Sequence, residues 1–452
     1  MEKLFGTDGV RGVANIHPMT AEIALKLGRA SAHVLKVHSE NSKVIIGKDT
    51  RLSCYMLEHA LSAGFCSMGV DVLLVGPMPT PAVSFLAQSM KCGAGVVISA
   101  SHNAFQDNGI KFFSKSGYKL DDATEEEIEK YVFSDQLDSF RPTANNVGKA
   151  FRIDDAKGRY IEFAKRSFPS HLSLKGLKIV VDCANGATYK VAPTTFHELG
   201  AEVIPIGINP NGININLDYG STDLSNLKEK VIEEKADLGI AFDGDGDRML
   251  VVDRNAEELD GDQIIAICAN SMIKNGRLKK NVVVATVMSN IGLDIALKEM
   301  GGHVVRTQVG DRYVVETMKH QGYNLGGEQS GHLLFLDKHR TGDGLISSLQ
   351  LLSVIQESGK DLTELKTLMT KYPQVLINVP VKEKKPIENM TILSSAIDEI
   401  SSILGKEGRV FVRYSGTEPK LRVMIEGKDI DEINVFANKL VDIVKDGERK
   451  EG

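Results

Sequence analysis

The chain has 452 residues, which suggests about three or four domains of the usual size. Hydrophobic residues make up 42% and charged residues 25% of it, a composition typical of a globular enzyme and unlike that of a fibrous or disordered chain. The net charge of −6 gives no general attraction to nucleic acid or to an anionic membrane, so an anionic ligand must be bound locally.

The N-terminal sequence MEKLFGTDGVRG reaches a turn rich in glycine and aspartate before a signal-peptide core could form. No stretch of the sequence approaches the roughly 18 apolar residues of a membrane span. The five cysteines are odd in number and far apart, which favours reduced thiols over a disulfide framework or a zinc site. We therefore expect a cytoplasmic protein.

Short β-branched runs alternate with longer amphipathic stretches along most of the chain. The helices expected from these patterns cover 21–37, 225–235 and 292–300. The expected strands cover 43–49, 71–76, 94–100, 177–184, 237–243, 281–287 and 303–308. Such alternation is typical of βαβ units with mainly parallel sheets. Near residue 372 the sequence KYPQVLINVPVKEKKP, with prolines and clustered lysines, indicates a linker into a smaller α+β unit.

The first unusual turn lies within residues 95–113, GVVISASHNAFQDNGIKFF, where an apolar strand ends in a polar segment. Ser101 and His102 are adjacent, so on an extended backbone their side chains face opposite ways, and no G-x-S-x-G elbow surrounds the serine. A hydrolase triad is therefore not expected. The sequence also contains no Walker A or G-x-G-x-x-G pattern. What remains is a serine that carries a phosphoryl group beside a metal, with Lys111 close enough in sequence to return to the same turn.

The second polar turn is AFDGDGDRMLVVD, in which Asp243, Asp245 and Asp247 alternate with glycines at the end of an expected strand. Alternate residues of an extended segment point the same way, so the three carboxylates can converge on one cation. An EF-hand is excluded, because Arg248 and Arg254 occupy the places of its glycine and its last glutamate. A solvated turn is the simpler alternative, but three aspartates without a cation would repel one another. If phosphate is also present, Mg²⁺ is the natural candidate.

Two further turns carry groups suited to a sugar phosphate. In GGEQSGHLLFLD, the side chains of Glu328, Ser330 and His332 share one side if the segment is extended, and they suit hydroxyl and amine groups of a sugar. A structural role for the histidine is the alternative. In RYSGTEPKLRVMIE, hydroxyls, arginines and a glycine surround a turn between two strands, which favours an anion-binding nest over a plain hairpin turn. The residues of this candidate nest are Arg413, Ser415, Gly416, Thr417 and Arg422.

The segments FGTDGVRG, GPMPTPAV, ISASHN, DGDGDR, GGEQSGH and RYSGTEPKLR occur in this order over nearly the whole chain, and together they resemble the α-D-phosphohexomutase superfamily. The resemblance implies an α/β fold of four domains around a central cleft: three similar α/β domains with mixed, mainly parallel sheets and a smaller α+β C-terminal domain. The expected boundaries are 1–152 with a phosphoserine loop, 153–255 with a metal-binding loop, 256–371 with a sugar-binding loop and 372–452 with a phosphate-binding loop.

The resemblance also implies a role for each polar turn. Ser101 would be the phosphoserine, and its phosphate would bind Mg²⁺ together with the three aspartates Asp243, Asp245 and Asp247. Glu328 and Ser330 would bind sugar hydroxyls, and the turn from Arg413 to Thr417 would hold the phosphate that is not transferred. The residues that would line the reacting centre are Arg11, His102, Lys111 and Arg248, with Lys111 as a candidate general acid/base.

One departure from the family pattern is visible in the serine turn. The family commonly has proline after Ser-His-Asn, whereas this chain has Ala104, followed by Phe105 and Gln106. No group needed for the chemistry is lost, but the rigidity that a proline gives to the turn is missing.

The activity implied is that of an isomerase that moves a phosphoryl group between O6 and O1 of glucosamine phosphate, with a hexosamine 1,6-bisphosphate as primer and intermediate. Its product would supply UDP-N-acetylglucosamine and cell-wall precursor synthesis. Glucose or mannose phosphate is the alternative substrate within the family. Outside it, a metal-dependent phosphatase would use clustered aspartates but no retained phosphoserine. The expected partner is the small sugar phosphate, with no nucleic acid and no membrane, and the sequence leaves the oligomeric state open, with a homodimer as one option.

Overall fold

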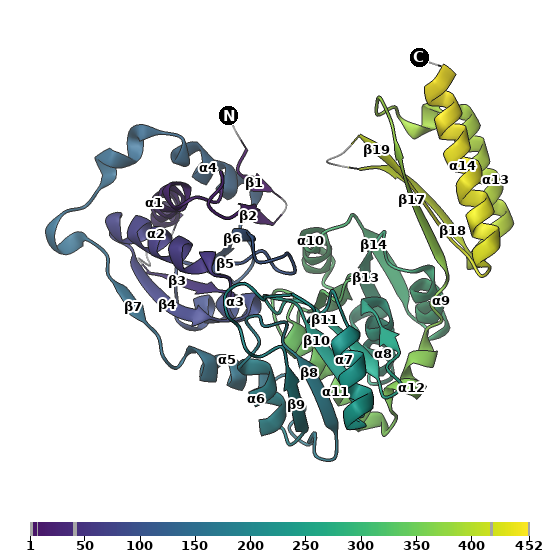
Figure 1. Cartoon of the computed structure of the whole chain (residues 1–452), viewed down its shortest axis with the longest axis horizontal. Coiled ribbons are helices and arrows are strands. Elements are labelled where there is room, and N and C mark those ends of the chain that lie inside the picture. The colour runs from purple at the N-terminus through teal and green to yellow at the C-terminus, as the bar shows by residue number, and fades with distance from the viewer. Residues whose placement is uncertain (1–2, 7, 39–42, 416–418, 451–452) are drawn as a thin grey trace.

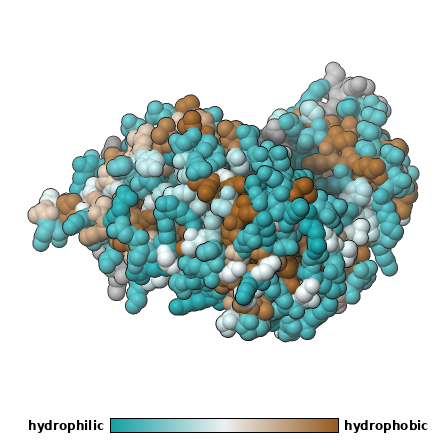
Figure 2. All heavy atoms as spheres, turned by 60° about the horizontal axis from the view of Figure 1, so that its bottom comes forward, coloured by the Kyte–Doolittle hydropathy of each residue, from teal (hydrophilic) through white to brown (hydrophobic). Residues whose placement is uncertain are grey.

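The computed structural model describes residues 3–6, 8–38, 43–415 and 419–450. Three α/β units and a smaller α+β unit follow one another from the N-terminus to the C-terminus (Figure 1). The expected fold class is therefore confirmed. In the described ranges, no helix is both long enough and apolar enough to cross a membrane. The face of the molecule shown in Figure 2 is largely hydrophilic, with apolar residues in small patches.

The first unit contains a seven-stranded mixed sheet in the order β1-β2-β6-β5-β3-β4-β7. Strand β3 runs parallel to β4 and β5, whereas β5 and β6 are antiparallel neighbours. The segment between β5 and β6 contains Ser101. The strands are β1 (Phe5–Gly6), β2 (Gly9–Val13), β3 (Lys43–Lys48), β4 (Asp71–Pro77), β5 (Ala94–Ile98), β6 (Asp107–Ser114) and β7 (Ala150–Arg152).

Helices cover both faces of this sheet because side chains alternate along its strands. On β3, Val44 and Ile46 belong to the apolar cluster on the side of α1 and α2, whereas Ile45 belongs to the cluster that includes α3. The helices of the unit are α1 (Ala21–His38), α2 (Ser53–Ser67), α3 (Thr80–Ser89) and α4 (Asp122–Val132).

The second unit contains a five-stranded sheet in the order β12-β11-β10-β8-β9, in which β8 is parallel to β9 and β10. Strands β10 and β11 are antiparallel, and the turn between them carries the three aspartates. The strands are β8 (Lys178–Asp182), β9 (Glu202–Ile206), β10 (Leu238–Phe242), β11 (Met249–Asp253) and β12 (Glu258–Leu259). The helices are α5 (Ala156–Lys165), α6 (Val191–Glu198) and α7 (Ser225–Glu234).

The third unit contains a four-stranded sheet in the order β14-β13-β15-β16, in which β13 is parallel to β14 and β15. Strands β15 and β16 are antiparallel, and the turn between them carries Glu328. The strands are β13 (Val282–Thr286), β14 (His303–Thr307), β15 (Leu325–Gly327) and β16 (Leu333–Phe335). The helices are α8 (Gly261–Lys274), α9 (Ile291–Glu299), α10 (Asp311–Gln321), α11 (Gly344–Ser358) and α12 (Leu362–Leu365).

The three α/β units thus share one local arrangement. In each, a strand that is parallel to its sheet neighbour continues through a polar turn into an antiparallel strand, as β5–β6, β10–β11 and β15–β16 do. These hairpins deliver the serine turn, the aspartate turn and the glutamate turn to one region of the molecule.

The fourth unit is an antiparallel three-stranded sheet in the order β17-β19-β18, with two helices on one face (Figure 1). Its elements are β17 (Gln374–Pro380), α13 (Thr391–Leu404), β18 (Arg409–Tyr414), β19 (Lys420–Glu426) and α14 (Ile430–Lys450). Short 3₁₀ helices of the described chain lie at Asp135–Phe140, Ala144–Asn146, Lys279–Asn281 and Lys366–Leu368, and within the fourth unit at Ile387–Asn389 and Gly405–Glu407.

The apolar core divides the molecule unequally. One buried cluster runs through the first three units and includes Phe113, Ile179 and Leu349. The fourth unit has a separate cluster that includes Ile400 and Val423. The first three units are therefore packed as one body, to which the fourth unit is attached.

Asn290, the N-cap of α9, fastens the fourth unit to this body. Its Nδ2 donates to the Tyr372 carbonyl oxygen at 2.9 Å and to Glu426 Oε1 at 3.2 Å, and its Oδ1 accepts from the Tyr372 amide at 3.0 Å. Glu426 is fully buried and also pairs with Arg409, at 2.7 Å. A single buried side chain thus joins the third unit to the linker and to the fourth sheet.

Replacement of Asn290 by Ala should loosen the fourth unit selectively. Loss of these buried hydrogen bonds costs roughly 1–3 kcal/mol, so we expect the Tyr372 amide to exchange with solvent at least about tenfold faster while β3 and β5 keep their protection. Hydrogen exchange followed by mass spectrometry measures this. Asn438→Ala on the exposed side of α14 is the matched control, and unchanged exchange at Tyr372 in the Asn290 variant would contradict this role.

Candidate active site

The three hairpin turns meet at a cavity of about 810 Å³. The first unit contributes Arg11 and Ser101, the second contributes Asp247 and Arg248, and the third contributes backbone and side chains around residues 309–313. Glu328 and His332 line the same cavity. Residues that the sequence separates by more than 200 positions therefore share one space.

Ser101 lies in a strained turn that presents its hydroxyl to the second unit. Its φ is +54°, in the left-handed region, and its Oγ donates to Asp243 Oδ2 at 2.6 Å. A Cβ at Gly244 would lie only 2.6 Å from the Ser101 carbonyl oxygen, so the two turns can touch because residue 244 is glycine.

The expectation that Ser101 and His102 face opposite ways is wrong. Ser101 Oγ lies 3.3 Å from His102 Nδ1, because the backbone at Ser101 is left-handed and not extended, which brings the two side chains together. Burial, followed by the charge of Arg248, lowers the pKa of His102. This favours the neutral imidazole beside the serine oxygen.

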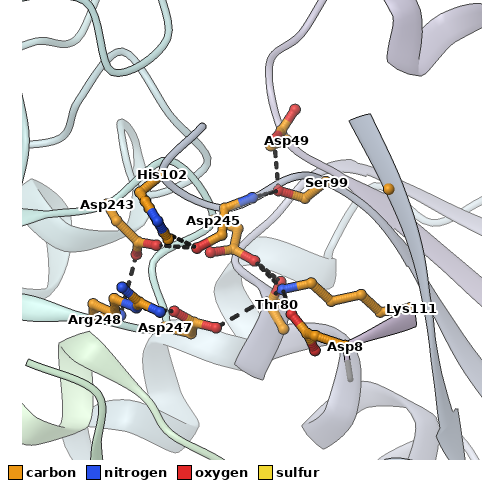
Figure 3. Close-up of polar contacts among 12 residues, drawn as sticks. Asp8, Asp49, Thr80, Ser99, His102, Lys111, Asp243, Asp245, Asp247 and Arg248 are labelled. Carbon is orange, nitrogen blue, oxygen red and sulfur yellow. Dashed lines mark hydrogen bonds and ion pairs between the residues drawn. The ribbon is translucent and has the colours of Figure 1, made fainter. Parts of the chain in front are cut away.

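The aspartate turn also differs locally from the extended segment that the alternation suggested. Strand β10 ends at Phe242, and the chain then turns through Gly246, whose φ is +71°. The three carboxylates converge nevertheless, and Asp243, Asp245 and Asp247 each offer one oxygen within 4.8 Å of the others (Figure 3). All three residues are buried.

The electrostatics of this turn fit a bound cation. Burial, reinforced by Asp247 and Asp245, raises the pKa of Asp243 well above its usual range. Asp245 Oδ1 and Asp247 Oδ1 are buried and have no hydrogen-bond partner among the described residues. Two unpartnered carboxylate oxygens beside a third buried carboxylate are the donor set of a hard divalent metal. The residues present therefore fit a metal site.

Lys111, on β6 of the first unit, contacts the aspartate turn of the second unit. Its Nζ is 2.9 Å from Asp245 Oδ2 and 3.1 Å from Asp8 Oδ2 (Figure 3). Burial alone would lower the pKa of Lys111, but Asp245, Asp8 and then Asp247 raise it above the usual value. The ammonium group is therefore held charged between the first and second units.

The glutamate turn is a tight turn and not the extended segment expected from the sequence. The Glu328 amide donates to the His332 carbonyl oxygen at 3.0 Å, and Gly331 has a φ of +89°. Glu328 and His332 therefore both line the cavity, whereas Ser330 is exposed at the tip and is not one of the described lining residues.

His332 stands between carboxylates of two units. Its Nδ1 lies 3.6 Å from Asp247 Oδ1 and its Nε2 lies 3.6 Å from Asp311 Oδ2. Burial would lower the pKa of this imidazole, but Asp247 and Asp311 raise it to about 9. In turn, despite its own burial, Asp247 has its pKa lowered by His332, Lys111 and Arg248.

Two arginines, Arg11 and Arg248, complete the cavity wall. Arg11 pairs with Asp8, and the backbone amide of Arg248 donates to Asp243 Oδ1 at 3.1 Å. Arg248 Nε is buried without a hydrogen-bond partner among the described residues. The wall thus presents donors and acceptors that have no hydrogen-bond partner among the described residues, which suits a ligand that carries phosphate and hydroxyl groups.

The candidate anion nest of the fourth unit lies apart from this cavity. Arg413 and Arg422 are cross-strand partners on β18 and β19, and burial and then Arg422 lower the pKa of Arg413. Ser415 Oγ accepts from Arg422 at 3.5 Å. Gly416 and Thr417 lie outside the described residues. No described residue of the fourth unit lines the cavity.

Several residues at the site were not identified from the sequence. Asp8 was visible within FGTDGVRG, but Asp311 and Lys119 stand in segments with no distinctive pattern. Lys119 Nζ lies 2.6 Å from Asp311 Oδ2 and also pairs with Asp8, which links the first unit to the third. Thr80, whose Oγ1 donates to Asp245 Oδ2 at 2.7 Å, was missed as well.

Comparison with known proteins gives a consistent result. Models of the phosphoglucomutase/phosphomannomutase family match four consecutive parts of the chain: α/β/α domains I, II and III at residues 2–138, 158–257 and 260–372, and the C-terminal domain at 376–443. The phosphoglucosamine mutase of Pelobacter propionicus is 59% identical over 446 residues, which cover 98% of both chains.

Two solved structures have a similar fold. A phosphoglucomutase/phosphomannomutase family protein from Burkholderia thailandensis matches with a TM-score of 0.81 at 23% identity, over 98% of both chains. The N-acetylphosphoglucosamine mutase of Aspergillus fumigatus, solved in complex with GlcNAc-6P and magnesium, matches with a TM-score of 0.65 at 19% identity, over 99% of this chain and 96% of that one. At these identities the structures support the fold alone.

Replacement of Asp245 by Asn should weaken divalent-metal binding at least about tenfold. Even replacing a residue that only hydrogen-bonds to a metal ligand lowers metal affinity roughly 10–100-fold. The amide removes a charge but can still accept from Thr80, so the turn should keep its shape. Calorimetric titration with Mg²⁺ measures the change, with Asp218→Asn at an exposed position as control. Equal affinity in the Asp245 variant and the control would exclude this residue as a ligand.

Proposed function

The chain belongs to the phosphoglucomutase/phosphomannomutase family, the α-D-phosphohexomutases, and we propose that it interconverts glucosamine 6-phosphate and glucosamine 1-phosphate. It is therefore an isomerase that acts as an intramolecular phosphotransferase. The choice of glucosamine is supported by bacterial phosphoglucosamine mutases that are 54–59% identical over nearly the full chain. The proposed product would supply amino-sugar nucleotide synthesis.

One observation carries the mechanism: the Ser101 hydroxyl, the aspartate turn and the glutamate turn meet at one cavity. A mutase needs a group that gives a phosphoryl group to one hydroxyl and recovers it from another, and a serine phosphate does this. A phosphatase would have no use for a retained phosphoserine or for a separate anion nest.

In the first half-reaction, the bond between Ser101 Oγ and phosphorus breaks while a bond from O1 of glucosamine 6-phosphate to phosphorus forms. The product is glucosamine 1,6-bisphosphate. After this intermediate has turned over, the phosphoryl group on O6 passes back to Ser101 Oγ and leaves glucosamine 1-phosphate. In the first half-reaction O1 loses a proton and Ser101 Oγ gains one, and in the second Ser101 Oγ loses its proton and O6 gains one. Lys111 is our candidate general acid/base: its ammonium group gives a proton to the leaving oxygen, and the amine so formed accepts the proton of the attacking hydroxyl.

The remaining side chains position the sugar phosphate and balance its charge. We assign Arg11, His102 and Arg248 to the transferring phosphoryl group, since all three stand around Ser101 or the aspartate turn. Charge neutralisation and positioning supply most of the catalysis in phosphoryl transfer.

Sugar and phosphate contacts are assigned to the other two turns. Glu328 and His332 would contact sugar hydroxyl or amine groups, while Ser330 would do so from the rim. The turn of the fourth unit, with Arg413, Ser415 and Arg422 and including Gly416 and Thr417, would hold the phosphate that is not transferred, once this unit moves toward the cavity.

For the metal we propose Mg²⁺, held by Asp243, Asp245, Asp247 and the phosphate on Ser101. The buried oxygen donors suit it, and the fungal relative of the same fold was solved with magnesium. When bound, Mg²⁺ would neutralise negative charge on the phosphoryl group.

The expected domain boundaries, 1–152, 153–255, 256–371 and 372–452, are kept as proposals. We also propose a cytoplasmic location, which agrees with five free cysteines, and we retain a homodimer as one option for the assembly.

Replacement of Ser101 by Ala should abolish the phosphoryl carrier and lower turnover by several orders of magnitude, because no oxygen replaces Oγ. Intact-protein mass after incubation with glucosamine 1,6-bisphosphate should show one added phosphoryl group on the native chain and none on the variant. Ser139→Ala at an exposed position is the control. Near-normal turnover in the Ser101 variant would contradict the phosphoserine mechanism.

A substrate panel tests the choice of sugar. A protonated 2-amino group is a cation and a donor, and acidic groups such as Glu328 line the cavity. We expect kcat/KM for glucosamine 6-phosphate to exceed that for glucose or mannose 6-phosphate by at least about tenfold, with the matching 1,6-bisphosphate as primer. Equal or better use of a neutral sugar would favour phosphoglucomutase/phosphomannomutase activity with the same mechanism.

A further inference from the structure

The serine turn contains a residue in the left-handed backbone conformation but lacks the glycine and proline residues that usually stabilise such turns. Residues 99–106, SASHNAFQ, contain neither glycine nor proline. Ser101 nevertheless has a φ of +54°, which an L-residue adopts only when its surroundings impose it. Something outside the turn must therefore hold it.

Arg51, which precedes α2, makes the contacts that do so. Its side chain is fully buried. Its Nη2 donates to the carbonyl oxygens of Ser101 at 2.9 Å and Asn103 at 2.8 Å, and its Nη1 donates to those of Asp107 at 3.0 Å and Ala104. Together with Nε, which donates to Asp49 Oδ2 at 2.7 Å, all five N–H groups of the guanidinium are used.

Asp49 holds the beginning of the same turn. Its Oδ2 accepts from Ser99 Oγ at 2.6 Å, and Ser99 Oγ in turn accepts from the Ser101 amide at 2.9 Å. The Arg51 amide donates to Asp49 Oδ1 at 3.0 Å, which fixes the acidic and basic side chains relative to each other. Asp49 and Arg51 thus hold the turn by hydrogen bonds before and after Ser101.

A residue of the second unit, Asn216, also contacts the backbone of the serine turn. Asn216 Nδ2 donates to the carbonyl oxygens of Ser101 at 2.9 Å and Asn103 at 3.0 Å, the same two oxygens that Arg51 Nη2 contacts. With its backbone oxygens held from two units, the turn leaves the Ser101 hydroxyl directed at Asp243.

We propose that Arg51 is the positioning residue for Ser101: it fixes the backbone of residues 101–107 so that the serine oxygen stays in line for phosphoryl transfer. The proposal rests on the proposed phosphoserine function. Arg51 does not touch the Ser101 Oγ, so it acts through the turn and leaves substrate binding unchanged. It takes the place of the rigidity that a proline at position 104 would give.

A lysine in place of Arg51 separates this role from that of a simple buried ion pair with Asp49. Lysine keeps the positive charge and can pair with Asp49, but it has three donors in place of five and no planar fork, so it cannot hold four carbonyl oxygens. Arg159→Lys is the control, because that arginine forms an exposed ion pair with Asp155.

For the full-length Arg51→Lys protein with saturating 1,6-bisphosphate primer, we expect kcat to fall about 100-fold, the order of loss that a small misplacement of a reacting group causes. KM for glucosamine 6-phosphate should stay within about twofold of the native value. Amide exchange of residues 101–107 should accelerate at least about tenfold, while β3 and α1 keep their protection.

Two outcomes would overturn the proposal. One is a kcat within about twofold of the native value; the other is exchange that accelerates equally throughout the first unit, which would mean that Arg51 serves general stability. Failure of the proposed function would look different, because the native chain itself would then neither isomerise sugar phosphates nor gain a phosphoryl group from the bisphosphate.

Discussion

The hydrogen bond between Ser101 Oγ and Asp243 Oδ2 is made across a boundary between two units, and the surrounding structure serves to keep that boundary fixed. Ser101 and the aspartate turn belong to separate sheets. The distance between them stays constant only if the backbones of the two units, and not merely their side chains, are held together. The Thr80 amide donates to the Asp245 carbonyl oxygen at 2.8 Å, and Asn216 reaches the serine turn from the second unit. Glycine at position 244 permits the approach. Contacts to the backbone between the first and second units thus fix the positions of the side chains at the site.

A second constraint is the balance of buried charge. Asp243, Asp245 and Asp247 place three carboxylates in one buried region, and isolated charges there would be too costly to retain. Lys111 and His332 offset part of this charge, and the unpartnered aspartate oxygens indicate where a cation would offset the rest. Since the compensating groups come from the first and third units, the charge balance itself depends on the way the units pack.

The sequence predicted the type of fold and the chemical turns well, for a physical reason. Strand alternation and β-branched runs are local properties, and turns such as DGDGDR combine residue types that have few structural uses. Local conformation was predicted less well, because the left-handed Ser101 and the tight turn after Gly327 depend on contacts with distant residues. Arg51, Lys119 and Asp311 were missed for the same reason. Apart from Asp49, which is two positions from Arg51, and His332, which lies beside Asp311 within the third unit, their partners lie 50 or more positions away in the sequence, so no local pattern indicates the contacts.

The division of the apolar core has a consequence for the thermodynamics of unfolding. One cluster spans the first three units and contains no residue of the fourth, which has a separate cluster, so we expect two cooperative blocks of unequal size. Every residue that lines the described cavity belongs to the larger block. Heat can therefore melt the fourth unit in a separate, smaller transition while the serine turn and the aspartate turn stay intact. A chain in that partly melted state would retain the groups that line the cavity and lose the arrangement of Arg413, Ser415 and Arg422 in the fourth unit.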